Sequence, residues 1–431
     1  MRQIYSLLFL ALLPFVVARL YFKGKALPAY RARIAERFAR YGMPRPTCAP
    51  VWIHAVSVGE CEAAFPLVRR LRQEQPDIPI LMTCTTPTGS SRIQAVLGST
   101  VAHVYLPYDL PRIARRFLLF FRPRIGIIME TELWPNLFLC AREFGIPLMI
   151  ANGRLSSRST RGYQRLSWLI KPVLAGVSGI AAQSQEDADR YIEIGAVPSR
   201  VMDAGNIKYD ISWTQEQAEA SQELRSSWFG SRPVIVAGST HPGEEEQILH
   251  AFSTVRKSFS EALLILVPRH PERGLDVMSL CKASGYAVRL FSHSSGLSLD
   301  DDILVIDRVG ELRRFYGAAD LAYIGGTLIP HGGQNPLEPL VSRVPVIFGP
   351  SMSNFKEIRK RILDAKAGLE VRSSTELAEQ IIRLLNSPVE ASHMGERGEQ
   401  MIHQNQGAVN RIYELTAELL KQSANRANRL N

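Results

Sequence analysis

The chain has 431 residues, 46% of them hydrophobic and 21% charged, with a formal net charge of +10. This length exceeds one ordinary hydrophobic core and predicts two domains. The composition excludes a disordered chain and a polytopic membrane protein. Residues 1–45 contain nine Lys or Arg and a single acid, Glu36, so this segment carries +8 (nine minus one). A basic excess beside an apolar segment indicates an anionic lipid partner rather than a nucleic acid.

The apolar segment near the N-terminus covers residues 4–18, where only Ser6 and Pro14 interrupt Leu, Phe, Val and Ala. With Tyr21 and Phe22 it reaches about 19 residues, close to the roughly 20 that span a bilayer. No small-x-small cleavage site precedes the Arg-rich stretch, which favours a retained signal-anchor over a secretory signal peptide. The basic residues follow the segment, so we expect attachment to the inner membrane with the body of the chain in the cytoplasm. A helix lying on the membrane surface is the alternative to a transmembrane helix.

Beyond residue 50, short apolar runs alternate with segments of helical spacing such as 61–75 and 111–121. This alternation predicts an α/β fold with parallel sheets covered on both faces. The polar segment 209–233 predicts a hinge with a lead-in helix. Expected strands are 51–56, 78–83, 102–106, 125–129, 148–151 and 179–182, then 234–238, 263–267, 287–290, 303–306, 321–324 and 344–348. Expected domains are an anchor over 1–25, an N-terminal domain over 26–210, a C-terminal domain over 211–410, and a helix over 411–431 that packs back toward the N-terminal domain.

The two series of strands open alike. In each, an apolar strand ends in a small-residue turn and a Gly-Glu pair starts a helix, at Gly59-Glu60 and at Gly243-Glu244. Sheets of this kind bind ligands at the carboxyl ends of their strands, so two crevices facing one another are the expected site. Neither turn has the G-x-G-x-x-G pattern of dinucleotide binding. The five cysteines form no C-x-x-C pair and no metal spacing, which predicts buried, reduced thiols.

Candidate catalytic residues follow the strands of the first series. Glu60 is placed to act as a general base, although an acid in the first turn of a helix also simply complements its dipole. Glu130 and Glu132 follow an apolar strand, where an acid is costly unless it is paired or used. Lys208 closes the first domain and either neutralises an anion there or is a surface lysine.

Candidate nucleotide-binding residues belong to the second series. Arg269 follows a strand and suits a phosphate, together with the free amides of the helix that starts after Gly238. The glycine-rich segment 325–339 lets the backbone approach a ligand closely. Asn335 and Glu338 lie three residues apart at a helix start, where a carboxylate can accept both hydroxyls of a ribose; a helix cap is the alternative.

The chain resembles the family of 3-deoxy-D-manno-octulosonic acid (Kdo) transferases along nearly its whole length. The resemblance rests on HAVSVGE at 54–60, ETELWPN at 130–136, GNIKYD at 205–210, GSTHPGEE at 238–245, VPRHPER at 267–273 and GGTLIPHGGQNPLEP at 325–339.

The resemblance implies a GT-B glycosyltransferase fold, in which two Rossmann-like domains face across a cleft and the N-terminal one binds the acceptor. It implies inverting, metal-independent transfer of Kdo from CMP-Kdo to the lipid A precursor (lipid IVA), without a cofactor. Glu60 is then the proton acceptor, and Glu130 and Lys208 support the transition state. The residues implied for CMP binding are Pro268, Arg269, Val309, Gly310, Glu311, Asn335, Pro336, Leu337 and Glu338.

Two other functions fit parts of the sequence. A different nucleotide-sugar enzyme, such as another lipid glycosyltransferase or an epimerase, would share the fold, but the expected anchor disfavours a soluble epimerase. A membrane-tethered nucleotide-binding scaffold would bind CMP without forming product, and it leaves the acids of the first series unexplained.

Overall fold

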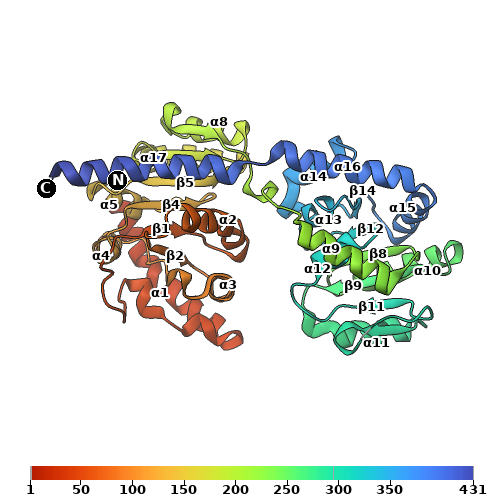
Figure 1. The fold of residues 1–431 in the computed structure, drawn as a ribbon. Coiled ribbons are helices and arrows are strands. Elements are labelled where there is room, and N and C mark those ends of the chain that lie inside the picture. Colours follow the sequence, from red (N-terminus) through yellow and green to blue (C-terminus); the bar gives the residue numbers. More distant parts are fainter. Residues whose placement is uncertain (1, 295, 431) are drawn as a thin grey trace. The chain divides into compact units, whose positions relative to one another are not determined.

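The computed structural model describes residues 2–294 and 296–430. The chain forms two compact units, Met1–Asp210 with Gln406–Asn431, and Ile211–Asn405. Each unit is built around a seven-stranded parallel sheet that is covered by helices (Figure 1). The chain therefore leaves the first unit after Asp210 and returns to it for its last helix, α17 (Ala408–Leu430). The carboxylate of Asp210 accepts hydrogen bonds from the amides of Gly407 and Val409, which ties the start of α17 to the end of the first pass.

The sheet of the first unit has the order β3-β2-β1-β4-β5-β6-β7. The order reverses between β1 and β4, because the chain builds outward from β1 in one direction and then returns to its other side. In sheets of this type the point of reversal is where ligands bind. The strands are β1 (Val51–His54), β2 (Ile80–Cys84), β3 (Ala102–Tyr105), β4 (Ile125–Met129), β5 (Leu148–Gly153), β6 (Gly179–Ala182) and β7 (Val201–Asp203).

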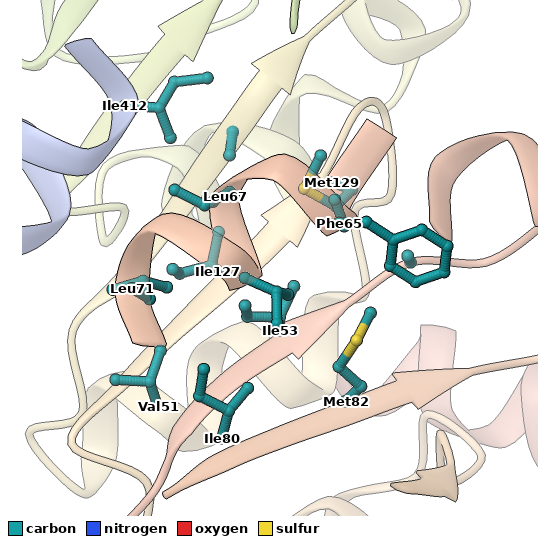
Figure 2. Packing of buried hydrophobic residues seen from close by; sticks show 14 of the residues in the cluster. Val51, Ile53, Phe65, Leu67, Leu71, Ile80, Met82, Ile127, Met129 and Ile412 are labelled. Atoms are coloured by element: carbon teal, nitrogen blue, oxygen red, sulfur yellow. The ribbon is translucent and has the colours of Figure 1, made fainter. Parts of the chain in front are cut away.

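Both faces of this sheet are buried, as expected for parallel strands with near-continuous apolar sequence. Val51 and Ile53 of β1 face a core that α2 and α17 complete, whereas Trp52 between them packs in the opposite core. Figure 2 shows the first of these cores, in which Ile412 of α17 joins the side chains of α2 and the strands. The helices of this unit besides α17 are α1 (Arg2–Ala26), α2 (Val58–Glu74), α3 (Pro87–Leu97), α4 (Pro111–Phe121), α5 (Pro135–Glu143), α6 (Ser157–Arg165), α7 (Ser167–Leu174) and α8 (Gln185–Glu193).

The sheet of the second unit has the order β10-β11-β9-β8-β12-β13-β14, with its reversal between β8 and β12. Its strands are β8 (Val234–Thr240), β9 (Leu263–Pro268), β10 (Val288–Leu290), β11 (Ile303–Val305), β12 (Leu321–Ile324), β13 (Val346–Phe348) and β14 (Gly368–Glu370). Its helices are α9 (Gln215–Leu224), α10 (Glu245–Ser258), α11 (Gly274–Ala283), α12 (Leu312–Gly317), α13 (Leu337–Leu340), α14 (Lys356–Asp364), α15 (Ser374–Asn386) and α16 (Pro388–Asn405).

The expected α/β architecture with two parallel sheets is confirmed, and all twelve expected strands are present, three with the expected ends and nine with shifted ends. Two strands were not expected, β7 and β14. Each has three residues and lies at an edge of its sheet, and their side chains are mostly only half-buried. An edge strand buries fewer of its side chains, so fewer of its residues must be apolar. Its run of apolar residues is therefore too short to be recognised in the sequence. The expectation of buried thiols is correct for four cysteines and wrong for Cys48, which is exposed.

Among the described residues, α1 is the one helix long and apolar enough to cross a membrane. Proline interrupts it only at Pro14, and its last turn contains Lys23 and Lys25. The apolar window of α1 is not buried inside the protein. The composition of the segment therefore agrees with a membrane anchor.

Candidate active site

Glu60 and Glu130 follow the two strands between which the order of the first sheet reverses. β1 leads through a short turn to Glu60 in the first turn of α2, and β4 ends directly before Glu130. β1 and β4 are hydrogen-bonded neighbours in parallel register, so their carboxyl ends lie at one edge of the sheet. The topology thus brings together two acids that lie 70 positions apart in the sequence (130 minus 60).

The Glu60 carboxylate is held by the turn that precedes its helix. The amide of Val56 donates to Oε2 at 2.8 Å, and the Ser57 hydroxyl donates to Oε1 at 3.3 Å. Burial raises the pKa of Glu60 to about 7, an effect that the hydrogen bond from Val56 opposes and the charges of Glu130 and Glu132 reinforce. A carboxyl group with a pKa near neutrality is a stronger base than an ordinary glutamate and is still ionised in about half of the molecules at pH 7.

Glu130 occupies a strained backbone conformation. Its φ of 56° lies in the left-handed region, which residues with a side chain rarely adopt. The strain is held on both sides, because the Glu130 amide donates to the carbonyl of Ala151 and its carbonyl accepts from the Tyr191 hydroxyl, both at 2.9 Å. Such conformations cluster at functional sites, which supports a role for Glu130. Burial, and then the Glu130 charge, raise the pKa of nearby Glu132.

Lys208 lies in a short 3-10 helix, η5 (Ile207–Tyr209), which follows β7 and contacts α2. The lysine is half-buried, and its amide donates to Asn206 Oδ1 at 3.0 Å. Glu60, Glu130 and Lys208 thus all lie at the carboxyl edge of the first sheet. Glu60 and Glu130 are close enough for their charges to interact.

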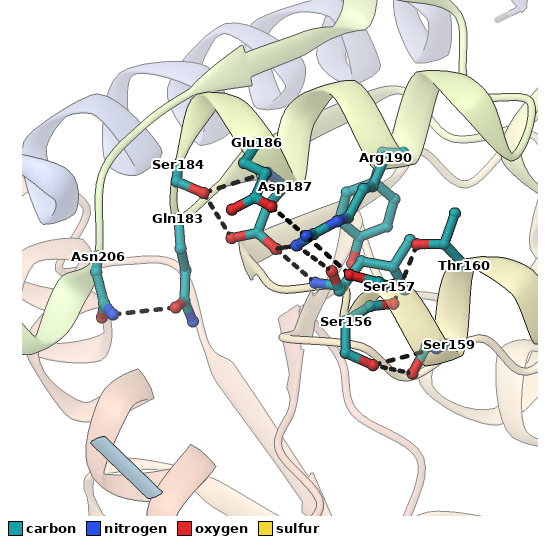
Figure 3. Close-up of polar contacts among 12 residues, drawn as sticks. Ser156, Ser157, Ser159, Thr160, Gln183, Ser184, Glu186, Asp187, Arg190 and Asn206 are labelled. Carbon is teal, nitrogen blue, oxygen red and sulfur yellow. Dashed lines mark hydrogen bonds and ion pairs between the residues drawn. The ribbon is translucent and has the colours of Figure 1, made fainter. Parts of the chain in front are cut away.

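A chain of amides at the same edge was not predicted from the sequence. Asn206 donates to the Gln183 side chain at 3.0 Å, Gln183 donates to the Asn152 carbonyl at 3.1 Å, and Asn152 Oδ1 accepts from the Ile207 amide at 3.1 Å. Figure 3 shows the contact between Asn206 and Gln183. The chain joins the ends of β5, β6 and β7 and so fixes the position of the segment with Lys208. The only local signals were Asn152 at the end of β5 and Asn206 after β7.

The loop beside this chain is held by Asp187 of α8 (Figure 3). Its carboxylate accepts from the Leu155 amide and from the Ser184 hydroxyl, each at 2.8 Å. Arg190, one turn later, donates to the Leu155 carbonyl at 2.9 Å. The backbone amide and carbonyl of Leu155 are therefore both paired, which holds the loop after β5 in a fixed position.

Arg269 follows β9 in the second unit, directly after buried Pro268. Its amide donates to the Thr240 carbonyl at 2.9 Å, and its side chain is exposed. The neighbouring helix α10 starts with its own acids, one of which, Glu245, is 1% exposed and forms an ion pair with Arg273 at 2.8 Å. Arg269 is therefore a better candidate for a phosphate than the start of that helix, which we had expected to share the role.

The glycine-rich segment after β12 is organised by the buried carboxylate of Glu244. Its oxygens accept from the amide of Gly326 at 2.7 Å, of Thr327 at 3.0 Å and of Leu328 at 3.1 Å, and from the hydroxyl of Tyr323 at 2.7 Å. Glu244 is fully buried. The sequence places Glu244 at a helix start but does not reveal these contacts, because the residues that it joins lie 79 to 84 positions away.

Close backbone approach explains one glycine at this edge, and a left-handed backbone conformation explains its neighbour. A Cβ on Gly325 would lie 2.3 Å from the carbonyl oxygen of Ser239, and Gly326 has a φ of +69°. The segment also closes on itself, because Gly333 donates to Gly326 and Gln334 donates to Gly325 through their backbones. The result is a fixed loop at the point where the second sheet reverses.

Asn335 and Glu338 meet at the start of α13. The Asn335 side chain donates to Glu338 Oε1 at 3.2 Å and accepts from the Leu337 amide at 3.1 Å. The helix cap proposed as the alternative is not formed, because the N-cap residue of α13 is Pro336, which has no capping side chain. The two contacts of Asn335 instead orient its own side chain and that of Glu338. The residues between them, Pro336 and Leu337, are buried and hold the short helix in place.

The third segment expected to bind CMP, residues 309–311, follows β11. Val309 is 81% exposed, Gly310 has a φ of +94°, and Glu311 forms an ion pair with Arg314 at 3.5 Å. All the residues expected to bind CMP thus lie at the carboxyl edge of the second sheet, after β9, β11 and β12.

Three histidines gather beside the glycine-rich segment, a feature that the sequence analysis did not single out. The rings of His241 and His331 stack with centroids 4.3 Å apart, and His270 lies 6.4 Å from His241. Burial, and then the neighbouring histidines, lower the pKa of His241 to about 4, with Arg269 adding to the effect. Arg269 beside these rings is the cation at this edge that a bound anion would meet. Within residues 2–294 and 296–430, no group of three or more His, Cys, Asp or Glu is placed to hold a metal ion.

Comparison with known proteins gives three kinds of similarity, to a family model, to relatives in sequence and to a solved structure. The family model described as 3-deoxy-D-manno-octulosonic-acid transferase (kdotransferase) matches residues 32–211. The 3-deoxy-D-manno-octulosonic acid transferase of Haemophilus influenzae is 38% identical over 98% of this chain and 99% of its own length; that of Bordetella pertussis is 34% identical over 89% and 91%. The crystal structure of Anabaena HepE in complex with UDP matches over 86% of this chain and 100% of its own chain, with a TM-score of 0.54 and 13% identity. This match shows a likeness of fold.

Proposed function

The chain belongs to the 3-deoxy-D-manno-octulosonic acid (Kdo) transferase family and is a glycosyltransferase, and on that premise we propose that it transfers Kdo from CMP-Kdo to a hydroxyl of the lipid A precursor, with inversion and without a metal ion. The observation that carries the proposal is Glu60, a half-buried glutamate of raised pKa at the carboxyl edge of the first sheet. The second unit by itself presents Arg269 and the glycine-rich loop at the carboxyl edge of its own sheet.

In the proposed reaction the acceptor hydroxyl attacks the anomeric carbon of Kdo from the face opposite CMP. The new oxygen–carbon bond forms, the bond between that carbon and the phosphate oxygen of CMP breaks, and the hydroxyl proton passes to Glu60. Attack opposite the leaving group inverts the anomeric carbon. The raised pKa of Glu60 suits this proton transfer, because the base must hold the proton once the hydroxyl has lost it. Glu130 and Lys208 are proposed to stabilise charge beside it.

In the donor site, Arg269 is proposed to bind the phosphate of CMP. Negative charge grows on this phosphate as CMP leaves, and a guanidinium stabilises it through charge-assisted hydrogen bonds. CMP has one phosphate rather than a pyrophosphate, so one arginine can supply the compensation that a metal ion supplies to diphosphate donors. Glu338, oriented by Asn335, is proposed to accept the ribose hydroxyls. Residues 309–311 complete the site.

The lipid acceptor is supported by the apolar helix α1, which belongs to the same unit as Glu60. A helix of this composition partitions into a bilayer, and the basic residues around it favour anionic phospholipid. We propose attachment to the inner membrane from its cytoplasmic side, where an amphiphilic acceptor is concentrated at the surface.

Mass analysis tests the proposed function directly. The purified full-length chain is incubated with CMP-Kdo and lipid A precursor, and the lipid is expected to gain the mass of one or more Kdo residues. The same incubation with UDP-sugars is the control for donor class. Transfer from a UDP-sugar and not from CMP-Kdo, or CMP binding without product, would refute the proposal.

The pH dependence of transfer is expected to follow the Glu60 carboxyl. A base works only when it is deprotonated, so the rate should rise as the pH increases, about tenfold per unit below a midpoint near 7, and level off above it. The kcat of transfer measured between pH 5 and pH 9 reports this titration.

A matched variant checks that Glu60 sets the midpoint. The charge of Glu132 contributes to the raised pKa of Glu60, so Glu132→Gln should move the midpoint to lower pH. Glu74→Gln at the far end of α2 leaves that environment intact and should not move it. A rate that is flat from pH 5 to pH 9 in the wild-type chain would contradict the assignment of the base.

A further inference from the structure

We infer that α1 does not cross the bilayer but lies in the plane of an anionic membrane surface, with the first unit packed along one side of the helix. This inference deepens the membrane attachment proposed above and does not depend on the sugar that is transferred. Its basis is that both ends of the helix are bound to the same folded unit, along one side of which α1 runs in Figure 1.

The first two turns of α1 are joined to buried polar groups of the unit. The Arg2 guanidinium donates to Asn136 Oδ1 at 2.9 Å, the Tyr5 hydroxyl donates to Asp109 Oδ2 at 2.9 Å, and the Ser6 hydroxyl accepts from Asn136 Nδ2 at 3.1 Å. Asn136 is fully buried and Asp109 is 2% exposed. Arg2 also forms an ion pair with the carboxylate at the end of α5.

These contacts belong to the framework of the unit rather than to a loose surface. Asp109 also accepts from the amides of Asn136 and Leu137, at 3.0 and 2.8 Å, and so binds the otherwise free amides at the start of α5. Removing the beginning of α1 would leave buried polar atoms of Asp109 and Asn136 without these partners, at a cost of about 1 to 3 kcal/mol for each group.

The last turns of α1 contact the segment that directly follows them, and this segment continues into the same unit. The Arg31 guanidinium lies 3.9 Å from the centre of the Tyr21 ring, and Lys23 lies over the ring of Tyr30 at 5.3 Å. Tyr30 and Arg31 belong to the 3-10 helix η1 (Pro28–Arg31), which leads into the body of the unit. There, buried Arg37 donates to the Thr85 carbonyl at 2.8 Å.

A spanning helix cannot satisfy both sets of contacts. Its ends must lie on opposite sides of about 30 Å of hydrocarbon. α1 has 25 residues and a length of about 37 Å, so a spanning α1 would carry Arg2 and Tyr5 to the far side, away from Asn136 and Asp109. The folded unit contains many charged groups and cannot follow the helix through the bilayer.

The exposure of side chains along α1 shows one covered side and a wide apolar side. The partly covered positions 2, 5, 6, 9, 13, 17 and 20 recur every three to four residues, which is the spacing of one helix face. Phe9 on this face lies beside Tyr108, with the centres of the two rings 6.5 Å apart. The other faces expose large apolar side chains, Leu7, Leu8, Phe15 and Phe22 among them, each by more than 60%.

A bilayer surface is the partner that fits these faces. The exposed apolar area is costly in water and is relieved by burial among acyl chains. Arg19, Lys23 and Lys25 are exposed at the C-terminal half of the helix, where they meet anionic headgroups. A free interfacial helix has a polar face because that face is in contact with water. In α1 the corresponding face packs on the folded unit, so the sequence needs no stripe of polar residues.

This arrangement connects the membrane helix to the catalytic edge, the carboxyl edge of the first sheet at which Glu60 and Glu130 lie. Asn136, which contacts Arg2 and Ser6, lies in the first turn of α5, six residues after Glu130. The segment from Glu130 to Asn136 therefore has one end at the catalytic edge and the other on the membrane helix.

Thiol labelling in intact cells tests the position of the N-terminus. Gln3→Cys is made in a Cys48→Ser chain, expressed in a Gram-negative host and treated with a membrane-impermeant maleimide that reaches the periplasm. We expect no labelling in intact cells and full labelling once the cells are opened. Gln422→Cys on α17 is the matched control for a cytoplasmic thiol, and a host protein with a periplasmic thiol is the control for reagent entry. Labelling of Gln3→Cys in intact cells, equal to that of the periplasmic control, would overturn the inference.

A disulfide between α1 and α5 provides a second, independent measurement. Ser6→Cys with Asn136→Cys, in a Cys140→Ala chain, should form an internal disulfide in isolated membranes under mild oxidation. Leu8→Cys with Asn136→Cys should not, because Leu8 is 61% exposed on another side of the helix. If the Ser6 pair fails to form in chains that sediment with membranes, α1 is not in the plane, while the proposed transferase activity stands. A chain found in the soluble fraction would instead refute the membrane attachment itself.

Discussion

Glu60→Gln is expected to lower the kcat of Kdo transfer about a thousandfold, within the range for loss of a general base. The amide keeps the size of the side chain and one oxygen that can accept from the Val56 amide, so the turn before α2 should keep its conformation. An amide cannot take up the acceptor proton. The kcat and KM for CMP-Kdo are measured in the steady state at pH 8, where the wild-type base is deprotonated.

Two comparisons separate loss of chemistry from loss of structure. Glu62→Gln changes an exposed acid of the same helix and should retain nearly full activity. The Tm of Glu60→Gln should equal that of the wild type, and its affinity for CMP should be unchanged, because the donor residues belong to the other unit. A Glu60→Gln chain with more than a tenth of wild-type kcat would remove Glu60 from the role of base.

Glu244→Ala is expected to abolish CMP binding and to lower the free energy of unfolding of the second unit by about 3 kcal/mol or more. The substitution leaves the buried amides of Gly326, Thr327 and Leu328 without an acceptor, together with the Tyr323 hydroxyl. The loop that precedes Asn335 and Glu338 would then lose its fixed form. CMP affinity is measured by calorimetry and stability by urea unfolding.

A graded series distinguishes positioning of the loop from general damage. Glu244→Gln keeps one oxygen that can accept hydrogen bonds but places an amide NH2 against the amide donors of the loop. CMP affinity should therefore fall, while the loss of stability should be smaller than in Glu244→Ala. Glu246→Ala removes an exposed acid from the same turn of α10 and should change neither quantity. If Glu244→Gln bound CMP as tightly as the wild type, the carboxylate would not be the group that shapes the donor site.

Glu60 and Glu244 show how far local sequence can predict a site. Both are the glutamate of a Gly-Glu pair at the first helix of a Rossmann-like unit, and the sequence alone suggested similar surroundings. In the structure Glu60 is half-buried and burial raises its pKa to about 7, whereas Glu244 is fully buried and bonded to a loop of the same unit. The bonds of Glu244 reach residues 79 or more positions away, which no local pattern encodes.

The sequence by itself determined the α/β architecture, the family, and the strand after which each proposed site residue lies, except for Lys208, which follows the unexpected strand β7. It could do so because a buried parallel strand requires a continuous apolar run, and because functional side chains follow such runs directly. The short edge strands β7 and β14 escaped detection because partial burial demands little of their sequence.

Only the tertiary structure decided which of these residues meet and how α1 is held. The strand order places Glu130 beside Glu60, Glu244 beneath the glycine-rich loop, and His241 against His331. Composition made α1 equally suited to crossing a membrane or lying on one. The position of α1 in the membrane depends on hydrogen bonds from Arg2 and Tyr5 to groups more than 100 positions away. A helix whose two ends are both held at one folded unit cannot have those ends on opposite sides of a bilayer.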